Sequence, residues 1–506
     1  MRVLIDTNII IHREASRVLN KDIGLLFNWL DRLNYEKCIH PLSIEEISTY
    51  QDKNVVETMK VKIDNYNLLK TESNDKDLIL ELRKTDKSKN DSIDTSIIKE
   101  VYNNRVQYLI TEDRGIHHKA RILGVSERVF KIDDFLEKSI AENPDLKDYQ
   151  VLAVKTEYFG NIDLEDVFFD SFKEDYKEFE NWFNRKSDKV SYVCITDDTV
   201  KAFLYLKVEK KNQENYSDIS PPFIPKKRLK IGTLKVTSTG YKLGERFLKI
   251  VFDNALENKV EEIYVTIFDK REEQRRLIYL LQDWGFKEWG IKKTVNGYEK
   301  VYVRTFGKNL PINLSNPKET FPFISRKTRK YIIKIEPEYH RELFPDSVNT
   351  RESKDGLMDN EPHRNRIDKV YISHNKDRHL EKGDIVIIYR IGETSPKRFS
   401  STVTSICIVD EVFDNIKSFN DFYQICNRRT FITKSELDSN WWNKIPKVRP
   451  FVINLLYAHS LPTPKPTLNN LIELGIIESV FNIPRGFIEI SNSQFNSLTN
   501  FAYRVK

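Results

Sequence analysis

The chain has 506 residues and a formal net charge of +6, so it is too long for one core, and roughly three domains of 100–200 residues are expected. No stretch approaches the ~20 apolar residues of a membrane span, and Asp6 and Asn8 interrupt the apolar start, which argues against a signal peptide. The four cysteines are scattered, with no Cys-x-x-Cys pair that would indicate a zinc knuckle or a disulfide framework. We therefore expect a cytoplasmic protein that does not associate with membranes.

The basic residues are concentrated toward the C-terminus. Residues 306–506 carry 30 Lys and Arg against 23 Asp and Glu, whereas residues 1–305 carry 52 against 53. A basic excess favours a polyanionic partner, because each phosphate contact releases condensed counterions. An excess of this size is also common on a solvated surface, so both interpretations stay open.

Residues 1–138 alternate short apolar strands with amphipathic helices. The first strand ends just before Asp6, and further strands are predicted at 38–40, 108–111 and 129–132. Helices are predicted at 25–33, from 43 to 50, at 93–102 and at 133–138, and the polar stretch 70–90 is predicted to be a loop or an exposed helix. This alternation indicates a parallel sheet covered on both faces.

Acidic residues recur along this segment where ligands would gather. Asp6 and Asp113 follow predicted strands, and the carboxyl ends of strands are where open α/β sheets bind ligands. Glu46 and the pair Asp91 and Asp94 lie on helix starts, and the pair shares one helix face. Converging carboxylates repel one another, and Mg²⁺ or Mn²⁺ relieves that repulsion. Such a site supports metal-assisted phosphodiester hydrolysis.

On these residues, 1–140 resembles a PIN domain, the fold of many metal-dependent ribonucleases and of bacterial toxin nucleases. The resemblance implies that catalysis and metal binding rest on Asp6, Glu46, Asp91 and Asp113, with Asp94 as a further metal ligand. It also places the Thr111 hydroxyl near the metal and gives Asn8 a role in orienting the first carboxylate.

Each of these residues also has an ordinary interpretation. Any single Asp in this segment could cap a helix or be solvated, and it is the combination that favours a metal site. Glu45 competes with Glu46, which we prefer because it directly precedes the apolar Ile47, as in the family pattern. His117 and His118 are expected to be ordinary helix-start residues rather than ligands.

Residues 150–306 mix strands and helices, with antiparallel-looking strands at 192–195 and 202–208. A strand at 229–236 enters a glycine-bearing turn and leaves as a helix, and exposed N–H groups at such a helix start can bind a pyrophosphate. A second strand and helix then lead to Gly285 and Phe286.

This order resembles the GNAT acetyltransferases, which bind acetyl-coenzyme A. The resemblance implies a mixed sheet and a coenzyme A pyrophosphate turn formed by Gly240, Lys242, Leu243 and Gly244, followed by Glu245 and Arg246. The chain departs from the family at three positions: Thr239 stands where an arginine is usual, Lys242 where a further glycine is usual, and Leu281 where a tyrosine often acts as general acid. Tyr279 lies two positions away and would face elsewhere on a helix. The segment could therefore transfer acetyl groups, sense coenzyme A or serve as a scaffold.

A proline-bearing linker is predicted at 307–325, followed by many short β-branched strands in 326–506. A Lys-Gly-Asp turn feeds a strand at 384–390, and a second strand follows at 401–409. This pattern resembles the PUA-like barrels that include ASCH and EVE domains, which often engage RNA or modified bases. Aromatic and basic side chains that could stack on and clamp nucleotides, or belong to the core, are Tyr389, Arg390, Phe399, Trp441, Trp442 and Arg449.

The expected fold is thus multidomain α/β and α+β: a PIN-like parallel sheet, a GNAT-like mixed sheet and a PUA-like β-barrel. The expected function is a metal-dependent endoribonuclease that uses Mg²⁺ or Mn²⁺ on RNA, with tRNA among the candidates, as part of a bacterial toxin or defence protein with an antitoxin or inhibitor protein as partner. The first alternative is an acetyl-CoA-dependent N-acetyltransferase of tRNA or protein whose PIN domain binds RNA, and the second is a non-catalytic RNA-binding regulator. DNA as substrate and the oligomeric state stay open.

Overall fold

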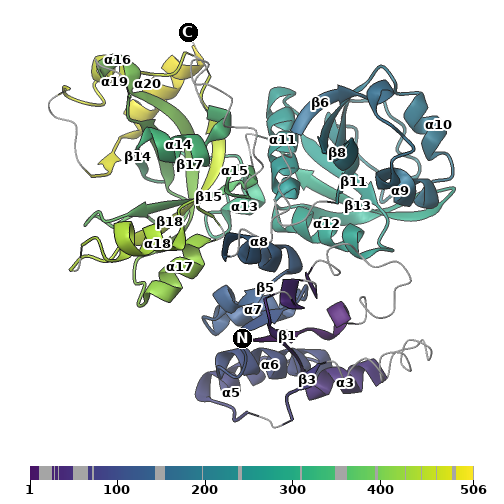
Figure 1. Cartoon of the computed structure of the whole chain (residues 1–506). Helices are drawn as coiled ribbons and strands as arrows, with labels where there is room; N and C mark the ends of the chain where they lie inside the picture. The colour runs from purple at the N-terminus through teal and green to yellow at the C-terminus, as the bar shows by residue number, and fades with distance from the viewer. Residues whose placement is uncertain are drawn as a thin grey trace. The chain divides into compact units, whose positions relative to one another are not determined.

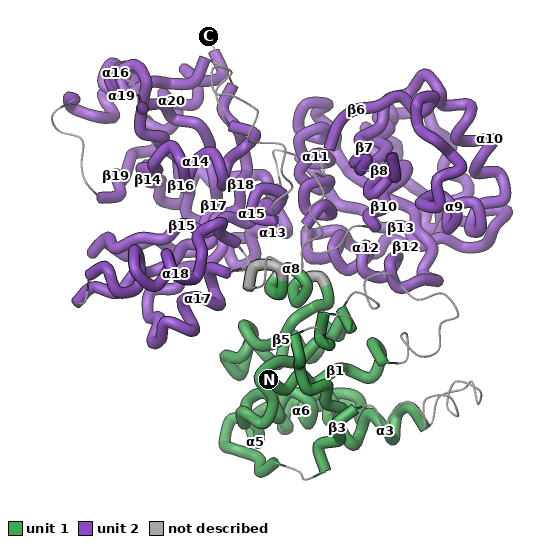
Figure 2. Tube along the Cα trace, viewed as in Figure 1, with its two compact units in different colours: residues 1–148 green, residues 149–506 purple. Residues whose placement is uncertain are grey.

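The computed structural model divides the chain into two compact units, residues 1–148 and 149–506 (Figure 2). It describes residues 1–10, 26–27, 29–31, 33–48, 66–70, 73–142, 154–196, 198–237, 242–307, 310–347, 362–393, 397–427, 429–445, 447–462, 464–480 and 486–504. Among these residues no helix combines the length and the apolar character needed to cross a bilayer.

The first unit contains a five-stranded parallel sheet in the order β3-β2-β1-β4-β5 (Figure 1). Its elements are β1 (Arg2–Ile5), β2 (Glu36–Ile39), α3 (Pro41–Ser48), β3 (Asn67–Leu68), α5 (Asp77–Arg83), α6 (Lys89–Tyr102), β4 (Tyr108–Ile110), α7 (Arg114–Ile122), β5 (Val129–Phe130) and α8 (Ile132–Glu142). The predicted parallel sheet is therefore confirmed. Within the predicted helix at 25–33, the structure describes residues 26–27, 29–31 and 33, whereas positions 25, 28 and 32 lie outside the described residues.

Alternate residues of β1 enter two separate apolar clusters, which is how a strand buried on both faces behaves. Val3 and Ile5 pack with α8 on one face. Leu4 packs with α5, α6 and α7 on the other. Since both faces are covered, the exposed edge formed by the carboxyl ends of the strands is where polar side chains can gather.

The second unit begins with an eight-stranded mixed sheet in the order β6-β7-β8-β10-β11-β13-β12-β9. Its elements are β6 (Val154–Tyr158), α9 (Asp170–Asp175), α10 (Phe179–Asn184), β7 (Val190–Thr196), β8 (Thr199–Glu209), β9 (Ile219–Ser220), β10 (Arg228–Val236), α11 (Leu243–Glu257), β11 (Glu262–Ile267), α12 (Glu272–Asp283), β12 (Lys287–Thr294) and β13 (Gly297–Thr305). The helices α11 and α12 pack on one face, and the aromatic cluster around α9 and α10 packs on the other.

The parallel strands β10 and β11 separate partway along their length. They pair from Arg228 to Ile231 on β10. The register of β10 against β8 then shifts between Ile231 and Thr233, and β10 continues beside β8 to Val236. The pair is therefore open at its carboxyl end, on the side from which the chain continues toward α11.

The C-terminal part of the second unit contains a six-stranded sheet in the order β15-β18-β17-β16-β14-β19. Its elements are α13 (Pro317–Thr320), β14 (Lys330–Ile335), α14 (Pro337–Leu343), α15 (Pro362–Asn365), β15 (Asp368–Ser373), β16 (Ile385–Arg390), α16 (Lys397–Ser400), β17 (Thr402–Phe413), α17 (Phe419–Asn427), α18 (Lys434–Glu436), the π-helix η7 (Leu437–Trp442), β18 (Phe451–Ser460), α19 (Leu468–Glu473), β19 (Ile488–Glu489) and α20 (Asn492–Tyr503).

The predicted closed barrel is wrong for the part of this sheet that the structure describes, because the ladder ends at β15 and β19 without joining them. The strand β19 contributes two ladder positions against β14, which leaves it too short to close the sheet. A side chain spans part of the opening instead, since the Tyr371 hydroxyl on β15 donates to the Lys334 carbonyl on β14 at 2.9 Å. The sheet is curled but open.

The segment predicted as a linker packs against the middle sheet. Phe321 is fully buried against Phe252 and Trp284. The buried Arg304 guanidinium donates to the Glu319 carbonyl at 3.2 Å and to the Phe321 carbonyl, and it lies 4.3 Å from the Phe252 ring centre. The same apolar cluster continues into the C-terminal sheet through Ile367, Ile408 and Leu456. The middle and C-terminal sheets therefore share one core.

Candidate metal centre at the edge of the first sheet

Asp6 and Thr111 meet where β1 and β4 end side by side. The Asp6 N–H donates to the Ile110 carbonyl at 3.1 Å, which extends the pairing of the two strands. The Thr111 hydroxyl then donates to Asp6 Oδ2 at 2.7 Å, and Asp6 is 5% exposed. Thr111 Oγ1 also accepts the Asp113 N–H at 3.0 Å. The strand ends predicted to gather ligands thus fix the orientation of Asp6 beside Asp113.

Asp94 and Asp113 form what we call the carboxylate pair, which borders a small space at the start of α7. Asp113 is the N-cap of α7, and its Oδ1 accepts from the Gly115 N–H at 2.6 Å and the Ile116 N–H at 3.1 Å. A Cβ atom added to Gly115 would lie 3.0 Å from Asp113 Oδ1 and 3.0 Å from Asp94 Oδ2. Because Gly115 has no side chain, both carboxylate oxygens can approach it this closely, and we call the position of the missing Cβ the Gly115 space.

Burial and the charges of neighbouring carboxylates disfavour the ionised forms of Asp6 and Asp94. Burial raises the pKa of Asp6 to about 6, with smaller contributions from the charges of Asp113 and Glu46 and an opposing one from the Thr111 hydrogen bond. Burial also raises the pKa of Asp94 to about 7, and the charges of Asp113 and Asp6 add to this effect. Carboxyls that stay close at this cost are typical of functional sites.

Asp91 and Glu46, the other predicted site residues, have different surroundings from those of the carboxylate pair. Asp91 is the N3 residue of α6, and its Oδ2 accepts the Lys87 and Ser88 N–H groups at 2.9 and 3.1 Å. These bonds lower the pKa of Asp91. Glu46 is exposed on α3, within electrostatic range of Asp6. The structure thus turns Asp94 toward Asp113 and uses the Asp91 carboxylate to cap its helix.

His117 behaves as an ordinary helix-start residue. Its Nε2 donates to the Thr111 carbonyl at 2.9 Å, and burial lowers the pKa of its ring. His118 and Asn8 are exposed. Thr7, which the sequence pattern did not indicate, is fully buried, and its hydroxyl has no hydrogen-bond partner among the residues described.

The donor chemistry suits a hard divalent cation. Within the described ranges, no three His, Cys, Asp or Glu side chains are close enough together to enclose a metal ion. Mg²⁺ does not require such a set, because it keeps several waters and commonly binds one or two protein carboxylates together with a substrate phosphate. The approach of Asp94 and Asp113 at Gly115 and the raised pKa values of Asp6 and Asp94 fit that mode.

Two residues that position this site were not predicted. Gly115 matters because of the side chain it lacks, and Lys119 is a buried cation one helical turn further along α7. The sequence offered one indication of the geometry: Ser88 followed by Asp91 is a capping-box pattern, which the structure contains. That pattern would have assigned the Asp91 carboxylate to the helix start.

The turn predicted to hold a pyrophosphate is partly described. Gly240 and Thr239 lie outside the described residues. Lys242 is the N-cap of α11 in a left-handed conformation (φ 55°), with no side-chain cap. Leu243 is buried in the core, and a Cβ on Gly244 would lie 2.8 Å from Leu280 on α12. The structure therefore uses Gly244 for the close approach of two helices.

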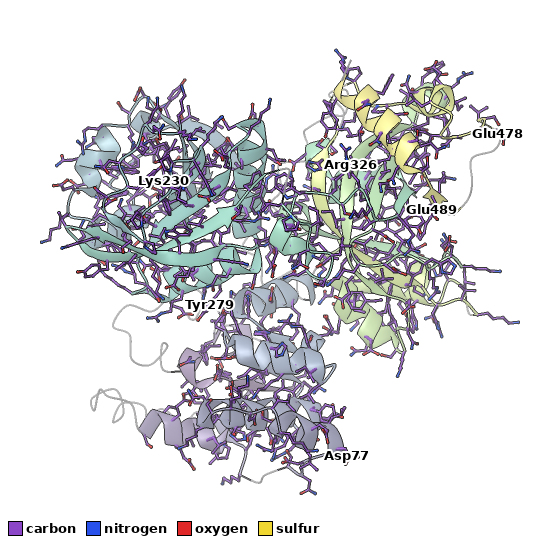
Figure 3. The ribbon with its side chains drawn as sticks, turned by 180° about the vertical axis from the view of Figure 1, so that it is seen from behind. Asp77, Lys230, Tyr279, Arg326, Glu478 and Glu489 are labelled. Carbon is purple, nitrogen blue, oxygen red and sulfur yellow. The ribbon has the colours of Figure 1, made fainter. Side chains whose placement is uncertain are left out.

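The other residues of interest in and around the middle sheet are buried or half-buried. Leu281 is fully buried, and Tyr279 packs partly buried against the same cluster (Figure 3). Lys230 on β10 is half-buried, 5.7 Å from the Tyr264 ring centre, and burial lowers its pKa. Tyr176 donates to the buried Glu299 carboxylate, and burial and this contact raise the pKa of the Tyr176 hydroxyl.

Most of the aromatic and basic candidates in the C-terminal sheet are engaged within the protein. Tyr389 and Trp442 are buried core residues, and Arg390 donates to Glu393 at 2.6 Å. Arg449 lies 4.6 Å from the Trp442 ring centre. Those with more exposed rings are Phe399, which is 59% exposed, and Trp441, which is half-buried and stacked on His374.

No protein-family model matches the sequence, and no curated protein matches it. Solved structures similar to part of the chain include a mutant form of the ZmASCH protein from Zymomonas mobilis, at 12% identity and a TM-score of 0.24, which covers 35% of this chain and 99% of that chain. Another is an acetyltransferase of the GNAT family from Streptococcus agalactiae, at 11% identity and a TM-score of 0.23, which covers 32% of this chain and 98% of that chain.

Proposed function

We propose that the first unit is a metal-dependent endoribonuclease that cleaves RNA phosphodiester bonds. The observation that carries the proposal is the approach of Asp94 and Asp113 at Gly115, within electrostatic range of Asp6 at the end of β1, with raised pKa values at Asp6 and Asp94. A bound Mg²⁺ or Mn²⁺ would polarise the phosphate, activate a water and neutralise charge on the leaving oxygen.

The chain's own residues hold and orient the donors. The Thr111 hydroxyl fixes the Asp6 carboxylate, and the α7 N–H groups fix Asp113 Oδ1. Asp94 faces this position across the Gly115 space. Glu46 is close enough to add negative charge without being buried. Asp94 and Asp113 would hold the cation together with a substrate phosphate, and Asp6 and Glu46 would add negative charge beside it.

The test compares purified full-length protein with Asp6→Asn, Asp94→Asn and Asp77→Asn. Asp77 is an exposed residue on α5 in the same unit and serves as the matched control (Figure 3). Each protein is incubated with end-labelled RNA, or with DNA of the same sequence, in Mn²⁺ or EDTA. We expect cleavage that needs Mn²⁺ and falls more than about 100-fold in the two site variants, which exceeds the roughly 10–100-fold cost of outer-shell changes. Unchanged cleavage by both site variants would contradict the proposal.

The second candidate is an acetyl-CoA-dependent N-acetyltransferase of tRNA or protein. It is favoured by the separation of β10 from β11 beyond Ile231, together with the uncapped start of α11. The buried Leu281 supplies no acid at the position where the resembled family often has a tyrosine. The same preparations are therefore also incubated with labelled acetyl-CoA. Transfer that survives Asp6→Asn, without RNA cleavage by the wild type, would favour this candidate.

A further inference from the structure

A buried lysine ties together the two helices that border the Gly115 space. Lys119 on α7 is 7% exposed, and its ammonium donates to Asp86 Oδ1 and to Thr95 Oγ1, both at 2.8 Å. It also donates to the Asp91 carbonyl. Asp86 precedes α6, whereas Thr95 and Asp91 belong to it, so one ammonium group joins α7 both to the start of α6 and to the segment before it.

The Lys119 contact is a buried polar cluster, in which Asp86 Oδ2 has no hydrogen-bond partner among the described residues. The Asp86 and Lys119 side chains are 5% and 9% exposed. Thr95 is fully buried, and its hydroxyl lies 2.9 Å from Asp86 Oδ1. A buried ion pair with added hydrogen bonds holds its geometry closely, because losing either partner leaves the other buried without compensation.

The same face of α7 carries Lys119 and Gly115, which are four residues apart and therefore neighbours on the helix surface. Gly115 lets α7 approach Asp94 on α6. From the next turn of α7, Lys119 bonds to the same helix α6 through Thr95 and the Asp91 carbonyl. Donor positions at a metal site must hold to within about 0.5 Å, so the spacing of α6 and α7 matters directly for the carboxylate pair.

We propose that Lys119, anchored by Asp86, is a positioning residue that fixes the separation of Asp94 and Asp113 for divalent-metal binding. The inference rests on the proposed metal-dependent function of this site. Lys119 acts through the two helices that carry the carboxylate pair, and its role is geometric.

A purely electrostatic role makes different predictions. If only the charge mattered, removing Lys119 would strengthen the binding of a cation, and removing the Asp86 charge would weaken it. If spacing matters, both changes weaken binding, because each breaks the same link between α6 and α7. The direction of the two effects therefore distinguishes the explanations.

The experiment measures Mn²⁺ binding to the full-length protein by isothermal titration calorimetry, without RNA, for Lys119→Met, Asp86→Asn and Lys119→Arg. The matched control is Lys99→Met: Lys99 on α6 is 5% exposed and forms an ion pair with Asp75 at 2.9 Å. Melting temperatures are recorded for every variant.

We expect Lys119→Met and Asp86→Asn to raise the Mn²⁺ dissociation constant by about 10-fold or more, with Lys119→Arg closer to wild type. Lys99→Met should lower the melting temperature without changing the dissociation constant. Tighter or unchanged binding by a folded Lys119→Met, or equal weakening by Lys99→Met, would overturn the inference and leave the nuclease proposal standing. If Lys119→Met does not fold, Thr95→Val decides instead, because it removes a hydrogen bond to the Lys119 ammonium without changing any charge. Weaker Mn²⁺ binding by Thr95→Val would then support the inference, and unchanged binding would overturn it. Absence of Mn²⁺ binding by the wild type would overturn this inference, whereas the nuclease proposal is decided by the cleavage assay.

Discussion

At the scale of single residues, Asp94 has a side chain whose ionisation destabilises the folded state. Its pKa in the folded state is about 7, above the value of about 4 in the unfolded state. At pH values between these two pKa values, the folded state therefore binds more protons than the unfolded state. The free energy of unfolding therefore falls as the pH rises from about 4 to about 7. Without metal, Asp94→Asn should raise the melting temperature at pH 8 and change it little at pH 5. Thermal melts in EDTA check this.

Asp91 provides the matched comparison, because its pKa is shifted the other way by hydrogen bonds from Lys87 and Ser88. Its contribution to stability is present above the unfolded pKa and is lost as the pH falls. Asp91→Ala should therefore lower the melting temperature at pH 8. A lower melting temperature for Asp94→Asn at both pH values would contradict the assignment of a buried, destabilising negative charge to Asp94.

The sequence allowed part of this site to be predicted, for a physical reason. Apolar runs mark strands, so the residues that follow them, Asp6 and Asp113, could be placed at one sheet edge from the order of residues alone. The contributions of Gly115 and Lys119 depend on how closely α6 approaches α7. That distance comes from tertiary packing, which periodicity does not encode.

At the scale of secondary-structure elements, the first turn of α7 tests whether the Gly115 space is functional. Alanine is the better helix former by up to about 1 kcal/mol, but its Cβ would crowd the Asp113 cap of α7, so the two effects oppose each other and Gly115→Ala should change the melting temperature little. Its Cβ would lie 3.0 Å from oxygens of both Asp94 and Asp113, which should displace the carboxylate pair and weaken Mn²⁺ binding. Calorimetric titration and thermal melts of the same sample measure both effects. Wild-type affinity in Gly115→Ala would show that the space is not used.

The individual strands of the C-terminal sheet could be predicted from the sequence, whereas the failure of that sheet to close into a barrel could not. The strands predicted at 384–390 and 401–409 correspond to β16 (Ile385–Arg390) and β17 (Thr402–Phe413). Barrel closure could not be predicted in the same way, because it depends on pairing between the edge strands, and β19 is too short to provide it. The side-chain bond from Tyr371 to Lys334 is likewise invisible in the local pattern.

At the scale of the whole molecule, the second unit behaves as one body although its sequence predicts two domains and a linker. Prolines at 311, 317 and 322 indicated an open connection. Pro317 instead begins α13, and Arg304 binds the carbonyls that follow. Helix α11 also contacts the C-terminal part, because Arg246 pairs with Asp346 through two bonds and Glu245 accepts the Ile367 N–H at 3.1 Å.

This shared core predicts that residues 149–506 unfold in a single transition. Phe321 is fully buried in the apolar cluster that both sheets share. Phe321→Ala should therefore lower the free energy of unfolding by roughly 3–5 kcal/mol and the temperature of that transition by several degrees. Phe399→Ala is the matched control, since Phe399 is 59% exposed, and it should leave the transition unchanged. Differential scanning calorimetry of the full chain makes the measurement. Separate transitions for the middle and C-terminal parts, with only one shifted by Phe321→Ala, would mean that the buried segment does not couple them.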